Sequence, residues 1–116
     1  MYLARSFAQK SIGLMYRASI RENEGMLFCF PFDHKWKIWM LNMRFPIDTV
    51  WLDSSRRAVH IERDMKPCKG VLSCRSYEPA KRARYVLELK SGAAARLKLR
   101  LGDRIESITS ACRAAQ

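Results

Sequence analysis

The sequence predicts a mostly β, α+β fold: a small antiparallel β-barrel-like or sandwich domain with two short helices. About six segments have the apolar or alternating pattern of strands, whereas only two short segments have a helical pattern. Most connections are short, and closing an antiparallel sheet on itself removes exposed strand edges. With 116 residues the chain corresponds to one domain, which we place at residues 1–109, followed by a loose tail at residues 110–116.

The expected strands are runs of apolar, aromatic or alternating residues bounded by proline, glycine or polar turns. They cover residues 26–30, 36–43, 47–52, 58–62, 84–90 and 104–109. The segment at 84–90 has the clearest alternation of apolar and polar side chains. The two helices are expected at residues 6–17 and 93–97, the second capped by Ser91.

Basic residues are concentrated in the second half of the chain, which includes a long polar loop at residues 64–82. The formal net charge is +11, and residues 54–116 have a balance of +9 against +2 for residues 1–53. The Lys and Arg side chains between residues 56 and 104 indicate a polyanion, such as RNA or an acidic membrane surface, as one class of partner. The simpler interpretation is a well-solvated surface that keeps the protein soluble.

The chain has no apolar run near the roughly 20 residues that cross a bilayer, and its N-terminus lacks the apolar core of a signal peptide. A cytoplasmic location without a transmembrane segment is therefore expected. In that compartment Cys29, Cys68, Cys74 and Cys112 are expected to be thiols. Within the apolar run MLFCF, Cys29 is interpreted as a small buried hydrophobic residue.

Residues 39–48 combine large apolar side chains with a few polar groups, as small-molecule pockets do. Trp39 could stack on a planar or sugar-like ligand, Asn42 offers a donor and an acceptor, and Asp48 could orient a ligand. We therefore expect a non-catalytic binding module, with the 64–82 loop bordering the pocket. The competing structural interpretation assigns Trp39 to the core and Asp48 to a turn cap.

The alternative to a binding module is a hydrolase that uses Asp48 or Cys68. Asp48 and Glu88 are candidates for a carboxylate pair, and the neighbouring lysines would favour a Cys68 thiolate. Cys68 and Glu88 complete the set of residues expected to contact a ligand. No cofactor and no metal are expected, because the spacing of the histidines and cysteines matches no zinc motif.

Several segments follow one another in an order and spacing that match a known family. They are GLMYR at 13–17, EGMLFCF at 24–30, WMLN at 39–42, FPID at 45–48, YVLEL at 85–89, and Gly92 with Gly102-Asp103. The chain thereby resembles the domain of unknown function 192 family, small bacterial and archaeal proteins, over residues 3–106. The resemblance implies a mostly β fold and no particular activity. The turn after residue 52 departs from the family's Asp-x-Gly pattern, because it reads Asp-Ser-Ser-Arg.

Overall fold

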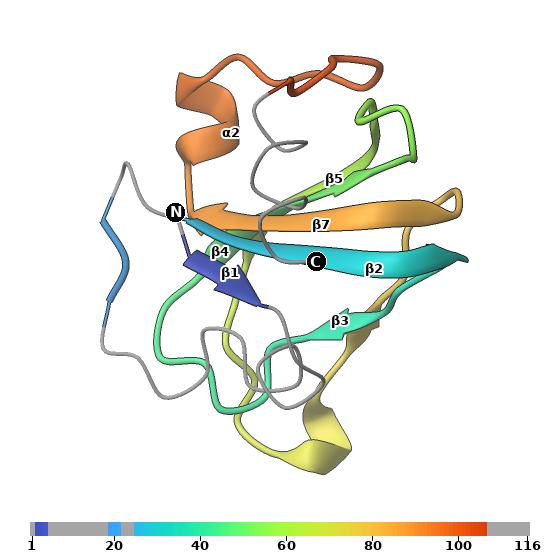
Figure 1. Ribbon diagram of the computed structural model, residues 1–116. Coiled ribbons are helices and arrows are strands. Elements are labelled where there is room, and N and C mark those ends of the chain that lie inside the picture. The colour runs from blue at the N-terminus through green and yellow to red at the C-terminus, as the bar shows by residue number, and fades with distance from the viewer. Residues whose placement is uncertain (1, 5–18, 22–24, 107–116) are drawn as a thin grey trace.

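A five-stranded sheet forms the middle of the molecule in the computed structural model, which describes residues 2–4, 19–21 and 25–106 (Figure 1). Its strands are β1 (Tyr2–Ala4), β2 (Gly25–His34), β4 (Ile47–Leu52), β5 (Ala58–Met65) and β7 (Ala83–Lys90). They lie in the order β1-β2-β7-β4-β5. Every neighbouring pair is antiparallel except β1 with β2, which is parallel. Because β1 and β5 are edges, the fold is an open sheet rather than a closed barrel.

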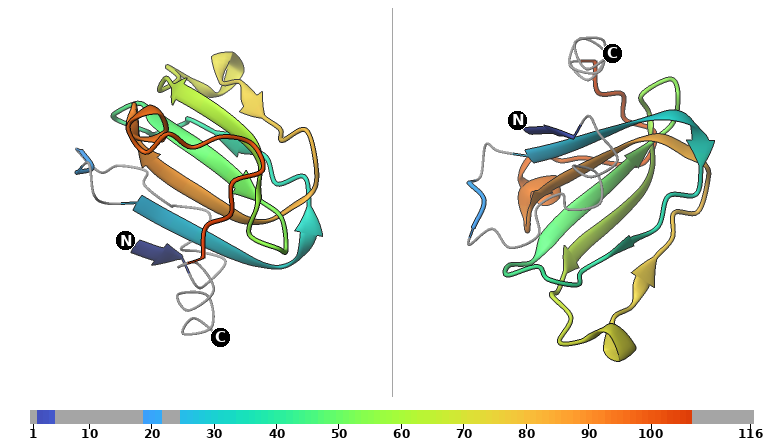
Figure 2. Two further views of the ribbon diagram at one scale, coloured as in Figure 1. Left: turned by 90° about the horizontal axis from the view of Figure 1, so that it is seen from above. Right: turned by 60° about the horizontal axis from the view of Figure 1, so that its bottom comes forward.

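Both faces of the sheet are covered, and the two covers differ in kind (Figures 1 and 2). Above one face in Figure 1 lie the short helix α2 (Ala93–Arg96) and the chain that follows it. Below the other face lies a two-stranded antiparallel sheet of β3 (Ile38–Trp39) and β6 (Ser76–Tyr77). The loop that enters β6 contains a single 3-10 turn, η1 (Val71–Ser73).

Alternation along the central strands separates the core into these two layers. Leu27, Leu87 and Val50 face each other across three strands and pack with Ala93 beneath α2. The residues next to these on the same three strands point to the other face of the sheet. They are Phe28, Val86 and Trp51, and they pack on the β3–β6 side. All six residues of β4 are buried, because this strand lies inside the sheet and is covered on both faces.

The mostly β prediction is confirmed, and the strand at 47–52 has the predicted bounds. β2 continues through Pro31. Its pairing with β7 is interrupted at this point, so the N–H that proline lacks is not needed for a hydrogen bond between the strands. The strand predicted at 36–43 is wrong in extent, since only Ile38–Trp39 pair.

Three further expectations concern the chain ends and the second helix. The strand predicted at 104–109 reduces, within the described residues, to a single bridge between Arg57 and Arg104. The cap predicted for Ser91 is wrong, because Gly92 occupies the cap position and the Ser91 hydroxyl donates to Asp64 instead. The helix predicted at 6–17 and the tail at 110–116 lie outside the described residues.

Candidate functional site

Asp48 is buried in β4, and its carboxylate accepts three backbone hydrogen bonds. Oδ1 accepts the amide of Asp64 at 2.9 Å, and Oδ2 accepts the amides of Gly92 at 3.0 Å and Ala94 at 2.9 Å. The last two amides are among those that α2 leaves unpaired at its start, where a negative charge is also favoured. Asp48 therefore fastens α2 and the end of β5 to β4.

Glu88 is buried on the opposite face of the sheet. In the register of β4 and β7, Asp48 faces Leu89 whereas Thr49 faces Glu88, so the two carboxylates project to opposite sides. Burial alone raises the pKa of Glu88 to about 7. The buried Thr49 hydroxyl opposite it has no hydrogen-bond partner among the described residues. The structure thus does not bring Asp48 and Glu88 together as a carboxylate pair.

Trp39 and Asn42 lie at the surface of the lower layer. Trp39 is 39 % exposed and pairs with Ser76 across the two-stranded sheet. Asn42 is exposed in the turn closed by the hydrogen bond from the Met43 amide to the Met40 carbonyl, and its φ is 63°. Asparagine is one of the few non-glycine residues that adopt this conformation readily, which explains its place in the turn.

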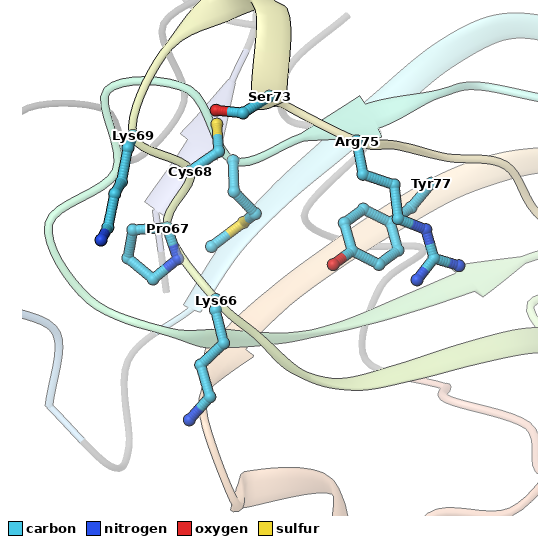
Figure 3. Close-up of a pocket in the computed structure, with 8 residues that line it drawn as sticks. Lys66, Pro67, Cys68, Lys69, Ser73, Arg75 and Tyr77 are labelled. Carbon is cyan, nitrogen blue, oxygen red and sulfur yellow. The ribbon is translucent and has the colours of Figure 1, made fainter.

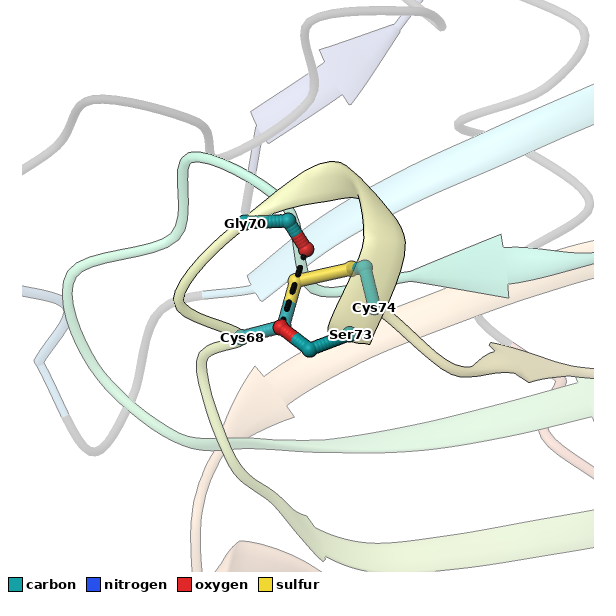
Figure 4. The surroundings of a disulfide bond; sticks show 4 residues. All are labelled: Cys68, Gly70, Ser73 and Cys74. Carbon is teal, nitrogen blue, oxygen red and sulfur yellow. Dashed lines mark hydrogen bonds between the residues drawn. A yellow bond between two sulfur atoms is a disulfide. The ribbon is translucent and has the colours of Figure 1, made fainter.

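Cys68 is bonded to Cys74 in a disulfide, with 5.1 Å between their Cα atoms (Figure 4). The expectation of free thiols is therefore wrong, and Cys68 offers no thiolate nucleophile. The reason is local geometry: the η1 turn, closed by the Ser73 amide and hydroxyl on the Gly70 carbonyl, brings the two cysteines within disulfide range. Cys29 is also disulfide-bonded, so no free cysteine remains among the described residues.

Beside this disulfide is a pocket of about 320 Å³ (Figure 3). It is lined by Met40, Lys66, Pro67, Cys68, Lys69, Ser73, Arg75 and Tyr77. The pocket arises because the disulfide loop is tied to the β3 side at two places. The Cys68 amide donates to the Met40 carbonyl at 3.4 Å, and Tyr77 pairs with Ile38 in the two-stranded sheet.

Three cations and no carboxylate line this pocket. The Arg75 guanidinium lies 4.4 Å from the centre of the Tyr77 ring, a distance typical of a cation–π contact. Figure 3 shows the two side chains next to each other. Lys66 pairs with Asp64 at 2.8 Å, and this hydrogen bond lowers the pKa of Asp64. Among the described residues no carboxylate pairs with Lys69 or Arg75. The pocket therefore has a positive potential above a partly apolar floor.

Of the five residues predicted to contact a ligand, only Cys68 lines this pocket, and it does so as a disulfide. Sequence reasoning missed Lys69, Arg75 and Tyr77 as site residues. Their signal was the density of basic residues in the 64–82 loop, which predicted a border but no pocket. In the described part of the chain, no cluster of His, Cys, Asp or Glu side chains is suited to hold a metal ion. No helix there has the length and apolarity to span a bilayer.

The structure thus combines an open, mostly antiparallel sheet with a pocket lined by three cations beside the Cys68–Cys74 disulfide. The chain belongs to the DUF192 family, described as Uncharacterized ACR, COG1430, whose model matches residues 1–107. The family resemblance seen in the sequence is thereby confirmed.

Relatives and solved structures agree with this assignment. A UPF0127 protein of Thermococcus kodakarensis is 35 % identical over 105 residues, covering 89 % of this chain and 61 % of its own length. One from Pyrococcus abyssi is 30 % identical over 109 residues, covering 92 % and 85 %. This chain thus spans about three fifths of the Thermococcus relative.

Two solved structures share the fold. A protein of unknown function from Novosphingobium aromaticivorans has a TM-score of 0.81 and 32 % identity, covering 90 % of this chain and 71 % of its own. A Sinorhizobium meliloti protein described as a candidate transcription regulator has a TM-score of 0.79 and 31 % identity, covering 88 % and 76 %. Both likenesses extend over most of the chain, so these two proteins share its fold.

Proposed function

We propose that this protein is a non-catalytic binding module, and that the pocket beside the Cys68–Cys74 disulfide holds a small anionic molecule. The observation that carries the proposal is the lining: Lys66, Lys69 and Arg75 without a carboxylate among the lining residues. Converging cations of this kind bind carboxylate or phosphate groups through charge-assisted hydrogen bonds. Buried Met40 and half-buried Tyr77 offer apolar contact to the rest of the ligand.

Trp39 and Asn42, which were first expected to bind a ligand, do not line the pocket. Trp39 is paired with Ser76, and side chains alternate along a strand, so the indole lies on the face of the two-stranded sheet opposite Tyr77. Asn42 occupies the turn that follows Met40. Neither residue therefore has a role in the proposed site.

Asp48 supports the same site from behind. Its Oδ1 accepts the Asp64 amide, and the Asp64 carboxylate in turn pairs with Lys66. Asp48 is thus a positioning residue that acts through Asp64, and it does not touch the ligand. Glu88 lies within the core, where it faces Thr49 rather than the cations of the pocket.

Binding is favoured over hydrolysis by the state of the two candidate catalytic residues. The Cys68 sulfur is already bonded to Cys74, and the Asp48 carboxylate is occupied by three backbone amides. A nucleophile or general base needs an available lone pair within reach of the substrate. Cys68 has no free thiol and Asp48 is buried out of reach of a substrate, so the hydrolase alternative has no supporting geometry.

The test is calorimetric titration of the full chain with inorganic phosphate, a nucleoside monophosphate and a dicarboxylate, under non-reducing conditions. We expect saturable binding by at least one of them, with a rise in melting temperature through mass action. Arg75→Gln should weaken the binding about tenfold, because one charge-assisted contact is lost. Lys81→Gln is the matched control, since Lys81 is exposed and does not line the pocket. Equal losses in both variants, or no binding of any probe, would contradict the proposal.

A further inference from the structure

The tip of the disulfide loop exposes two adjacent apolar side chains. Val71 is 64 % exposed and Leu72 is fully exposed, and both belong to η1. In Figures 1 and 2 this turn protrudes from the lower layer, away from the central sheet. Isolated surface leucines are common, but two neighbouring apolar side chains on a protruding tip suit contact with an apolar phase.

The tip is held in a fixed shape. The Cys68–Cys74 disulfide brackets it, and the Cys74 amide donates to the Val71 carbonyl at 3.3 Å. The Ser73 amide and hydroxyl both donate to the Gly70 carbonyl at 3.2 Å (Figure 4). A tip that is already ordered loses little conformational entropy on docking. Less of the free energy of its apolar contacts is therefore offset, and binding is stronger.

Cations surround the apolar tip. Lys69 precedes Val71 by two residues, Arg75 follows Leu72 by three, and Lys66 stands at the base of the loop. Exposed apolar side chains flanked by basic residues are suited to the surface of an anionic bilayer, where lipid phosphates lie just outside the acyl region. The apolar side chains can insert among the lipids, and the cations are attracted to the phosphates.

We propose that the 68–74 loop docks on an anionic phospholipid membrane, with Val71 and Leu72 inserted among the headgroups and Lys69 and Arg75 against the lipid phosphates. This inference goes beyond the binding of a soluble anion, because Val71 and Leu72 do not line the pocket, although Lys69 and Arg75 belong to both sites. Disulfides persist in secreted and cell-surface proteins, which meet such surfaces.

A second pair of exposed apolar side chains provides the matched comparison. Leu97 and Leu101 are 62 % and 66 % exposed, and they follow α2 on the other side of the sheet. They also have basic neighbours, Lys98 and Arg100, but they lie outside the loop that the Cys68–Cys74 disulfide closes. Because the two pairs lie on opposite sides of the sheet, one flat membrane cannot receive both at once.

The experiment is co-sedimentation of the oxidised full chain with vesicles of phosphatidylcholine alone or mixed with phosphatidylglycerol. We expect binding to the anionic vesicles only. Val71→Ser with Leu72→Ser should weaken it at least about tenfold, because two apolar side chains no longer insert. Leu97→Ser with Leu101→Ser should leave it unchanged. All four positions are exposed, so the variants are expected to fold, which circular dichroism checks.

Three outcomes would overturn the proposal. They are an absence of binding to anionic vesicles, equal binding by the Val71/Leu72 variant, and a loss confined to the Leu97/Leu101 variant. Gel filtration in parallel identifies a protein partner instead, if the Val71/Leu72 variant abolishes self-association. Titration of the same tip variant with inorganic phosphate keeps the two proposals apart. Unchanged phosphate binding with lost vesicle binding supports the tip, and failure of phosphate alone counts only against the pocket.

Discussion

Among the described residues, each face of the central sheet buries one carboxylate, and the two carboxylates have opposite surroundings. Asp48, on the α2 side, accepts three backbone amides. Glu88, on the β3–β6 side, is shifted toward the protonated form by burial alone, with its pKa raised to about 7. The comparison shows that burial of an acid does not by itself indicate function, because its partners decide whether it stabilises or strains the fold.

The covers of the two faces are also fastened differently. On one side α2 is tied to β4 through the Asp48 carboxylate. On the other side the indole of Trp51 donates to the Trp36 carbonyl, the indole of Trp36 donates to the Ala83 carbonyl, and a disulfide closes the loop before β6. The chain after α2 is also hydrogen-bonded to residues 56–58 through Gly102, Asp103 and Ile105. Both covers therefore have several attachments, and the distinguishing feature of α2 itself is that a buried charge holds it.

The largest expected effect is that of Asp48→Ala. This change removes three hydrogen bonds to a charged acceptor and leaves buried amides unpaired, so we expect a loss of about 4 kcal/mol in the free energy of unfolding. Urea unfolding at neutral pH measures it. Asp48→Asn, which retains an acceptor oxygen, serves as the control with about half the loss. A loss below about 1 kcal/mol for the alanine variant would show that Asp48 does not fasten the α2 cover.

Glu88→Gln should have the opposite sign and depend on pH. The folded-state pKa of about 7 exceeds the usual 4.5, so the native state binds the proton more tightly than the unfolded chain does. The stability of the wild-type protein is therefore full below pH 4.5 and falls as pH rises through about 7. At pH above 8 the glutamine variant should be more stable by roughly 3 kcal/mol, and at acidic pH the difference should vanish.

Denaturation curves collected across this pH range provide the check on Glu88. Curves for wild type and Glu88→Gln that stay parallel from acid to alkali would mean that Glu88 titrates normally. Such curves would also remove the contrast between Glu88 and Asp48. If the stabilities of the two proteins are equal at low pH and differ above neutral pH, the contrast is supported.

Removal of the disulfide should have an intermediate effect. Cys68→Ser with Cys74→Ser releases a short loop, since the two residues are six apart in sequence. The chain-entropy relation gives about 2 kcal/mol for a loop of this size. Thermal unfolding of the oxidised variant beside oxidised wild type measures this, without reductant, because a reductant would also open the disulfide of Cys29. A loss as large as that of Asp48→Ala would indicate that the disulfide is the main attachment of the lower cover.

The smallest effect is expected for Thr49→Val. The Thr49 hydroxyl is buried without a partner among the described residues, so replacing it by a methyl group should change stability by less than about 1 kcal/mol, in the stabilising direction. Combining it with Glu88→Gln in a double-mutant cycle measures the coupling across the strand pair. A clear destabilisation by Thr49→Val alone would mean that the hydroxyl does have a partner on this face.

Much of the sheet could be predicted from local pattern. The apolar run at 47–52 and the alternation at 84–90 became the two strands that pair at the centre, with bounds within one residue of those expected. The run at 26–30 likewise lies within β2. Alternation of apolar and polar residues can be recognised from neighbouring positions alone. The same is true of a continuous apolar run, which is the pattern of a strand buried on both faces.

The sites depended on contacts between distant segments. Asp48 meets Gly92 and Ala94 across 44 and 46 residues, so no local pattern could show that it caps α2. A shift of one residue in the register of β4 and β7 would have placed Asp48 and Glu88 on other faces. Local patterns along the chain are sufficient to predict the fold class, the strands β4 and β7 and the basic character of the 64–82 loop. Which acid is paired, which cysteines are bonded and which cations converge depends on how the chain folds, because each of these is a distance between groups that are apart in sequence.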